Sequence, residues 1–179
     1  GATTGASGAN QTYTTNEAYS FDGVDDSVDA SSNPWGTSNP DVLAGSLWFY
    51  PREGSRGELA GYYKAFDLTW DDLTSQGVSM RTWGDNTGSI GPTGLSLDTW
   101  HFAAYYWDIG VEIGISVNNS PYYTYPTSDG LDNMSGPLMA GARTETSTDY
   151  FDGRIDDFRC YDKRLTEAEV SNLYNTGRI

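Results

Sequence analysis

Cysteine, histidine and lysine are almost absent from this 179-residue chain, which holds one Cys, one His and two Lys. A single Cys160 excludes an intrachain disulfide. One histidine and one cysteine cannot supply the three or four ligands of a zinc site. The chain also lacks an apolar run near the ~18 residues that span a bilayer. We therefore expect neither a disulfide scaffold, nor a zinc protein, nor insertion into a membrane.

Basic residues of both kinds are scarce, since 10 Lys and Arg face 25 Asp and Glu and the formal net charge is −15. Such a chain is a poor binder of nucleic acid, because counterion release needs Lys and Arg at the phosphates. It is equally unsuited to an anionic membrane surface. Self-repulsion favours solubility, as in proteins of high-salt environments, which indicates a halophilic or marine source. Acidic extracellular calcium-binding modules share this composition.

Glycine, tyrosine and tryptophan are abundant, with 21, 13 and 6 residues. Aromatic and β-branched residues favour strands, and turn-forming residues separate the apolar runs at the spacing of a sandwich. We expect one all-β domain over residues 17–179, after a flexible linker or arm at residues 1–16 that is rich in Gly, Thr, Ser and Ala. The expected strands lie at about Ala18–Phe21, Ser27–Ala30, Leu43–Tyr50, Glu58–Tyr63, Phe66–Trp70, Gly77–Trp83, Trp100–Trp107, Glu112–Val117, Tyr122–Thr124, Leu138–Ala142 and Gly153–Tyr161.

The last of these strands carries an acidic residue among apolar ones. Side chains alternate between the two faces of a strand, so Asp156, Phe158 and Cys160 are expected on one face. This face is the more apolar one. The sequence therefore predicts that Asp156 points toward the core.

A short helix is predicted after this strand. Thr166 and Glu169 have the spacing of a capping box, and Leu165 and Val170 can close a hydrophobic staple. The residues that follow give one apolar stripe and end at Gly177, a plausible left-handed stop. We expect this helix to pack against the sandwich.

These C-terminal features resemble a known family. The strand Gly-x-Ile-Asp-Asp-x-Arg-x-Tyr, a basic residue, Leu-Thr and a Glu-Ala-Glu-Val helix that ends in Leu-Tyr are similar to the end of concanavalin A-like lectin/glucanase domains of the laminin-G-like group. Further similarity to this group lies in residues 18–26, 45–51, 100–118 and 136–143. The central hairpin of this group usually ends in Asn-Gly or Asp-Gly. Here it ends in Asn118-Asn119, which can also adopt positive φ. The resemblance implies a two-sheet antiparallel jelly-roll sandwich with one short C-terminal helix.

Glycoside hydrolases also use this sandwich, which makes any pair of nearby carboxyl groups a candidate catalytic pair. A glycosidase needs two carboxyl groups about 5–10 Å apart. The Glu-x-Asp-x-x-Glu run of sandwich glucanases is absent, and only Glu58 could accompany Glu112, a lone acid within a strand. His101 lies between aromatic residues with no nucleophile elbow nearby. We assign no catalytic residue and expect a protein that is not an enzyme, with a glycoside hydrolase as the least favoured alternative.

Calcium is the more serious metal candidate, because it prefers carboxylate and carbonyl oxygens. The segments 21–26 and 151–157 are both acidic and similar to each other. Since the first and last strands are neighbours in the resembling domains, these acids could converge on a structural calcium ion. Arg143, Arg154 or backbone amides are alternative partners for a buried Asp156. The candidate calcium ligands are Asp22, Asp25, Asp152 and Asp156.

Aromatic residues in loops are candidates for sugar binding. Sugar sites stack a pyranose face on Trp or Tyr and bind its hydroxyls with polar side chains. Trp48, Trp100 and Trp107 lie in expected strands and are assigned to the core. The candidate ligand-binding residues are Trp35, Trp83, Asp85, Asn86 and Tyr123.

The sequence thus predicts a non-catalytic carbohydrate-binding or adhesion module that recognises a glycan or cell-surface polysaccharide. The alternative is a structural decoration, spike or fibre domain whose partners are neighbouring subunits of a virion or cell-surface assembly. In both cases we expect an extracellular, cell-surface or virion-surface location.

Overall fold

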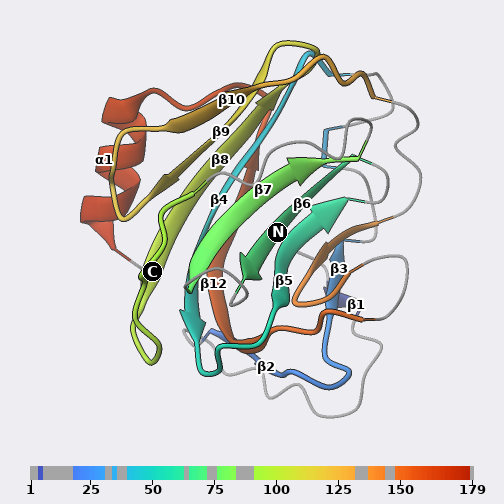
Figure 1. The fold of residues 1–179 in the computed structure, drawn as a ribbon, viewed down its shortest axis with the longest axis vertical. Coiled ribbons are helices and arrows are strands. Elements are labelled where there is room, and N and C mark those ends of the chain that lie inside the picture. The colour runs from blue at the N-terminus through green and yellow to red at the C-terminus, as the bar shows by residue number, and fades with distance from the viewer. Residues whose placement is uncertain are drawn as a thin grey trace.

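The protein is a sandwich of two antiparallel sheets followed by one helix, as Figure 1 shows. A computed structural model describes residues 4–5, 18–30, 34–35, 40–62, 65–71, 76–83, 91–131, 137–143 and 148–177. Within these residues each sheet has six strands. The predicted jelly-roll sandwich with a short C-terminal helix is confirmed.

In each sheet, some neighbouring strands come from segments that are distant in the sequence. The first sheet holds, in spatial order, β1 (Thr4–Gly5), β3 (Val28–Ala30), β11 (Leu138–Ala140), β5 (Gly57–Tyr62), β6 (Phe66–Asp71) and β7 (Gly77–Thr82). The second sheet holds β10 (Tyr123–Pro126), β9 (Glu112–Val117), β8 (His101–Asp108), β4 (Val42–Pro51), β12 (Asp152–Tyr161) and β2 (Tyr19–Asp22).

All eleven predicted strands are present, with ends that differ by a few residues. The one strand that the sequence did not predict is β1, in which Thr4 lies opposite Ala30 of β3. This strand falls within the expected arm at residues 1–16, and the remainder of that arm lies outside the described residues. The boundary between arm and domain stays a prediction.

The main core lies between the two sheets, where alternate side chains of each strand meet. In β8, for example, Ala103, Tyr105 and Trp107 point into this core, and Trp107 is buried as predicted. Other large core residues come from both sheets: Leu47, Phe49, Ile113 and Ile115 from the second, and Phe66, Leu68 and Trp70 from the first.

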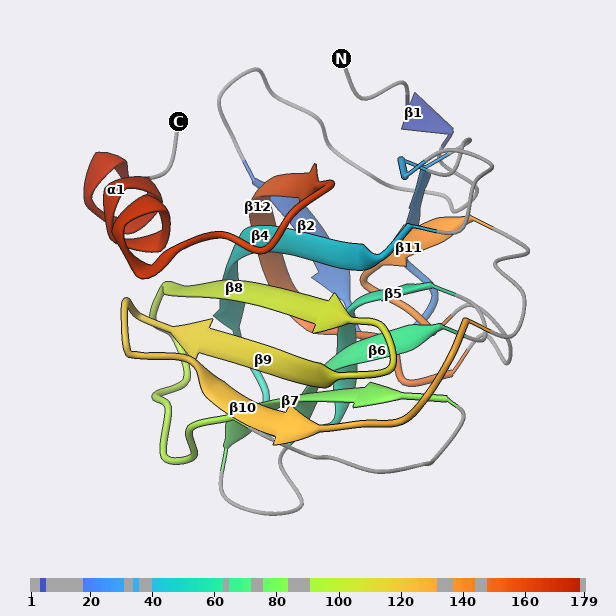
Figure 2. The same cartoon turned by 90° about the horizontal axis from the view of Figure 1, so that it is seen from above.

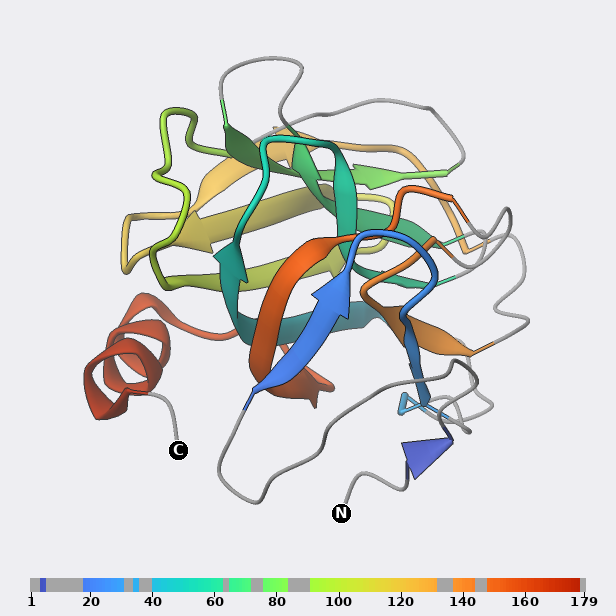
Figure 3. The same ribbon diagram turned by 90° about the horizontal axis from the view of Figure 1, so that it is seen from below.

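A second apolar cluster lies outside the sandwich, under helix α1 (Glu167–Thr176). Figures 2 and 3 show this helix beside the second sheet, on the side away from the first. Trp48 stacks on Tyr174 of the helix with their ring centroids 5.6 Å apart. The predicted capping box of Thr166 and Glu169 is present, and Gly177 ends the helix with a φ of 74°. No helix among the described residues is long and apolar enough to cross a membrane.

One prediction about β12 is wrong. The pairing of β12 with β4 shifts register between Asp156 and Arg159, which marks a β-bulge. Ile155 lies in the core, so its neighbour Asp156 faces outward, opposite Trp48 in the ladder. Beyond the bulge, Phe158 and Cys160 pack against the core. Asp156 therefore does not share the core face with them, because the extra residue of a bulge reverses the alternation of side chains.

Candidate functional site

The outward face of the first sheet carries two carboxyl groups on neighbouring strands. Because Phe66 and Leu68 of β6 point into the core, Asp67 between them points outward. On β5, Glu58 lies opposite Thr69, which also alternates with core residues of β6. Although they face away from the core, the side chains of Glu58 and Asp67 are buried, at 0% and 2% exposed.

These two carboxyl groups lie close enough to influence each other's charge. The Glu58 carboxyl lies over Gly61, where any Cβ would collide with its Oε1 atom. Thr69 Oγ1 donates to Glu58 Oε2 over 3.5 Å. Burial raises the pKa of Glu58 well above its ordinary value, and the nearby charge of Asp67 raises this pKa further. Glu58 therefore holds its proton more tightly than an isolated carboxyl group does.

A chain of ion pairs covers this carboxyl pair. Arg81 Nη2 lies 2.9 Å from Asp67 Oδ2, and Arg143 Nη2 lies 3.9 Å from the same oxygen. Arg143 Nη1 is 3.5 Å from Asp149 Oδ2, and Arg56 Nη2 is 3.7 Å from that oxygen. Arg56, Arg81 and Arg143, which we call the arginine cluster, are thus linked through Asp67 and Asp149.

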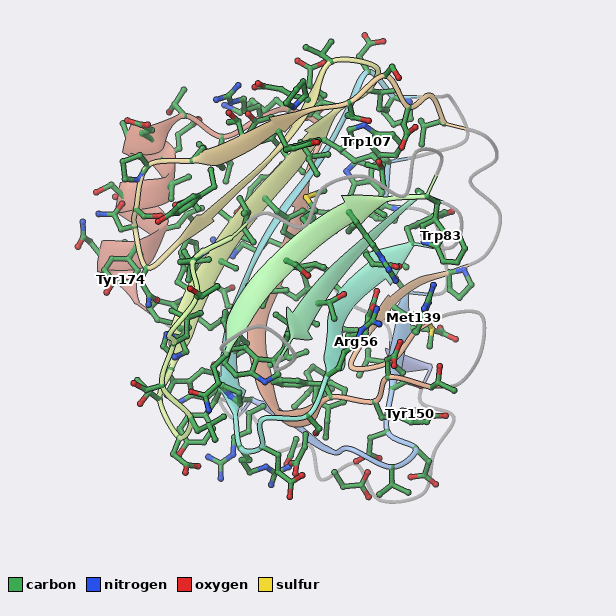
Figure 4. All side chains as sticks on the ribbon, in the orientation of Figure 1. Arg56, Trp83, Trp107, Met139, Tyr150 and Tyr174 are labelled. Carbon is green, nitrogen blue, oxygen red and sulfur yellow. The ribbon has the colours of Figure 1, made fainter. Side chains whose placement is uncertain are left out.

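Trp83 completes the site at the end of β7. Its indole Nε1 donates to Asp67 Oδ1 over 3.2 Å, and the Arg143 guanidinium carbon lies 4.8 Å from the ring centroid. Figure 4 shows Trp83 and Arg56 on the side of the molecule that carries β5, β6 and β7, together with Met139 and Tyr150. The indole is held from two sides by charged groups, which fixes its orientation.

The predicted ligand-binding residues do not lie together. Trp83 belongs to the site just described, whereas Tyr123 is 45% exposed on β10 of the second sheet. Trp35 packs edge-on against Tyr62 and Phe66 and donates from Nε1 to the carbonyl of Tyr161 over 2.8 Å, so it lies at the rim of the core. Asp85 and Asn86 lie outside the described residues.

The predicted calcium ligands are brought together only in part. Carboxylate oxygens of Asp22, Asp25 and Asp26 lie within 4.8 Å of one another. Asp152 lies opposite Asp22, but its Oδ1 pairs with Arg52 Nε over 2.8 Å. Asp156 follows Asp152 by four residues along β12, about 13 Å at the usual rise of a strand. The structure thus separates Asp156 from the cluster and adds Asp26, which the acidic run itself could have indicated.

The geometry of this acidic turn suits a hard cation. Asp26 is almost buried, and burial, followed by the charge of Asp22, raises its pKa. The Asp22 amide donates to Asp26 Oδ2 over 3.1 Å, and the Val24 amide donates to Asp22 Oδ1 over 2.9 Å. These hydrogen bonds hold the carboxylates of Asp22 and Asp26 at a single turn beside that of Asp25, and carboxylate oxygens are the ligands that calcium prefers.

The geometry offers no glycosidase pair at the predicted positions. Glu58 lies on the outward face of the first sheet, whereas Glu112 lies on that of the second, bound to the Tyr106 hydroxyl at 2.5 Å and Arg164 Nη1 at 2.8 Å. The two predicted glutamates therefore do not face a common cleft.

His101 and Cys160 have structural surroundings, as the sequence indicated. His101 is buried against Phe49, with its Nε2 2.9 Å from the Ser96 carbonyl and its Nδ1 2.9 Å from the Asn118 amide. Cys160 packs against the main core, and burial raises its thiol pKa to about 12.

The fold and the arrangement of strands define a lectin-like jelly-roll domain. Residues 22–171 match the laminin-G family model described as the concanavalin A-like lectin/glucanases superfamily, and the chain belongs to this family. The resemblance seen in the sequence is confirmed. No curated protein matches the chain.

Solved structures share this fold at low sequence identity. A putative carbohydrate binding protein from Bacteroides ovatus has a TM-score of 0.66 and 18% identity, over 84% of this chain and 44% of the other. The receptor binding domain of botulinum neurotoxin D has a TM-score of 0.71 and 13% identity, over 98% and 48%. A sialidase from Trypanosoma rangeli has a TM-score of 0.65 and 14% identity, over 94% and 28%. This chain spans less than half of each of these proteins.

Proposed function

We propose that the protein is a non-catalytic carbohydrate-binding or adhesion module of an extracellular or surface protein. The glycan binds on the outward face of the first sheet, beside Trp83. The observation that carries this proposal is the fixed indole of Trp83, which is held by Asp67 and Arg143 among polar side chains. Sugar sites combine such an aromatic ring with a few well-placed hydrogen-bonding groups. The names of the carbohydrate-binding and receptor-binding neighbours support a binding role for this fold.

A glycan array followed by calorimetry tests this site. Trp83→Ala is expected to weaken binding about tenfold, since an aromatic contact contributes about 1 kcal/mol or more beyond its buried area. Tyr123→Ala, on the other sheet, is the matched control and should bind like the wild type. If Tyr123→Ala lost binding and Trp83→Ala did not, the glycan site would lie on β10 instead. An array with no bound glycan would refute the proposed function.

The alternative of a structural domain in a surface or virion assembly draws support from β10. This edge strand exposes Tyr123 and Tyr125 at 45% and 40%. An exposed edge strand with aromatic side chains can pair with a neighbouring subunit. Under this alternative the protein would self-associate with rising concentration in light scattering, Tyr123→Asp would prevent this, and the array would be blank.

We further propose that Asp22, Asp25 and Asp26 hold a structural calcium ion. Thermal unfolding in calcium and in chelator provides the test. A ligand that binds only the folded state stabilises it by about 2.7 kcal/mol at 100 times its dissociation constant. Asp26→Asn should remove this shift, whereas Asp156→Asn should retain it because Asp156 lies farther along β12. Equal melting temperatures in calcium and chelator would refute the calcium site.

A further inference from the structure

The distribution of positive charge carries an inference that rests on the proposed glycan function. The chain has 10 basic residues against 25 acidic ones, and three of the 10 are the arginines of the cluster. Scattered arginines on so acidic a surface would each be expected beside several carboxylates. Instead Arg56, Arg81 and Arg143 share only Asp67 and Asp149 among the ion pairs of the described residues.

Positive charge is concentrated on this face. Arg56, Arg81 and Arg143 carry three positive charges, because arginine stays protonated in proteins. The carboxylates that pair with them are Asp67 and Asp149. Three guanidinium groups thus gather around two carboxylates in a protein whose formal net charge is −15.

The arginine cluster also keeps unused hydrogen-bonding capacity. Within the cluster, Arg81 alone makes close bonds to a described carboxylate, from Nε and Nη2 to Asp67 Oδ2 at 3.0 and 2.9 Å. The closest carboxylate contacts of Arg143 and Arg56 are 3.5 and 3.7 Å, which are ion-pair distances beyond ordinary hydrogen bonds. Their side chains are 19% and 30% exposed, so solvent reaches them. Guanidinium groups have five donors and suit planar or tetrahedral oxyanions.

Trp83 lies beside the arginine cluster, so a sugar ring that contacts Trp83 also lies near the arginines. Arg143 lies 4.8 Å from the centroid of the Trp83 ring, so a pyranose beside the indole has a guanidinium next to it. We infer that the glycan bound by this face carries an anionic group, a carboxylate or a sulfate, which Arg56, Arg81 and Arg143 bind beside Trp83. A neutral glycan would offer these positively charged donors no negatively charged acceptor.

Calorimetry with two matched pairs of ligands tests this inference. One pair is a glucuronate-containing tetrasaccharide and its carboxyl-reduced derivative; the other is a sulfated galactan tetrasaccharide and its desulfated derivative. We expect an acidic member to bind about tenfold or more tightly than its neutral derivative, because a bond to a charged group contributes about 1.5–3 kcal/mol. The pair that shows the difference distinguishes a carboxylate from a sulfate.

Variants separate charge recognition from stacking. Arg56→Gln should reduce the preference for the acidic member several-fold. This variant keeps the ion pairs of Asp67 with Arg81 and Arg143, so it is expected to disturb folding least. Arg143→Gln should abolish the preference, and Arg143→Lys should restore part of it. Arg154→Gln is the matched control, since Arg154 lies over Tyr50 on the second sheet and should leave the preference intact.

Two failures can be told apart. In the first, the protein binds the acidic and neutral members equally, or binds the neutral members alone. If Trp83→Ala also loses that binding, the anionic inference is overturned and the proposed glycan function stands. Absence of binding to all four tetrasaccharides overturns the anionic inference, and a blank glycan array overturns the proposed function as well.

Discussion

The buried carboxyl of Glu58 makes the stability of the protein depend on pH. Its pKa in the folded chain is raised well above its ordinary value, chiefly by burial away from water. A group with a higher pKa in the folded state binds its proton more tightly there, so it stabilises the fold at low pH. This contribution is complete below the ordinary pKa of about 4.5 and is lost as the pH rises through the folded pKa. Between the two values the free energy of unfolding should fall by about 1.4 kcal/mol per pH unit for one proton.

Glu58→Gln isolates this effect, because an amide keeps the shape of the protonated carboxyl and does not titrate. Urea unfolding at pH 4 to 8 should give similar free energies for the two proteins at the acid end. Above this the variant should become progressively more stable than the wild type. Glu53→Gln, at an exposed carboxyl, is the control and should follow the wild type. A difference between wild type and Glu58→Gln that does not change with pH would refute the raised pKa of Glu58.

Two further substitutions test the packing of β12 and its helix. Gly153→Ala should destabilise the protein by about 1–3 kcal/mol in urea unfolding, because the new Cβ would meet the Tyr50 carbonyl and the Phe151 ring. Gly130→Ala is the control and should be nearly neutral, since the space around its Cβ is open. Thr166→Ala should cost about 1 kcal/mol by removing the helix cap, and Thr166→Ser should retain most of that stability; equal unfolding midpoints for both variants would contradict the role of the cap.

Much of the fold could be predicted because its signals are local. Alternation of apolar residues predicted the strands, and the spacing of Thr166 and Glu169 predicted the helix start that the structure contains. Positive φ at Asn118 and Asn119 was likewise predictable from their side chains, and both have it. The two-residue β1 escaped prediction because its pairing with β3 depends on a distant segment.

The candidate site was only partly predictable. Trp83 was identified as an aromatic residue at a strand end, but its partners come from three other parts of the chain. Glu58 was considered only as a companion of Glu112, which lies on the opposite outward face of the sandwich. Arg143 was considered as a partner of Asp156, whereas it pairs with Asp67 and Asp149. Charge partners across strands depend on register and sheet order, which a linear pattern does not contain.

The sequence by itself determined the sandwich, the capped helix and the acidic turn at Asp22–Asp26, since each depends on residues close together in the chain. Only the tertiary structure decided which way Asp156 points, because the bulge in β12 arises from pairing with β4. It also decided that the arginine cluster gathers over Glu58 and Asp67, since these side chains meet only when β5, β6, β7 and the segment after β11 lie side by side. Local patterns fix elements, and long-range pairing fixes the site.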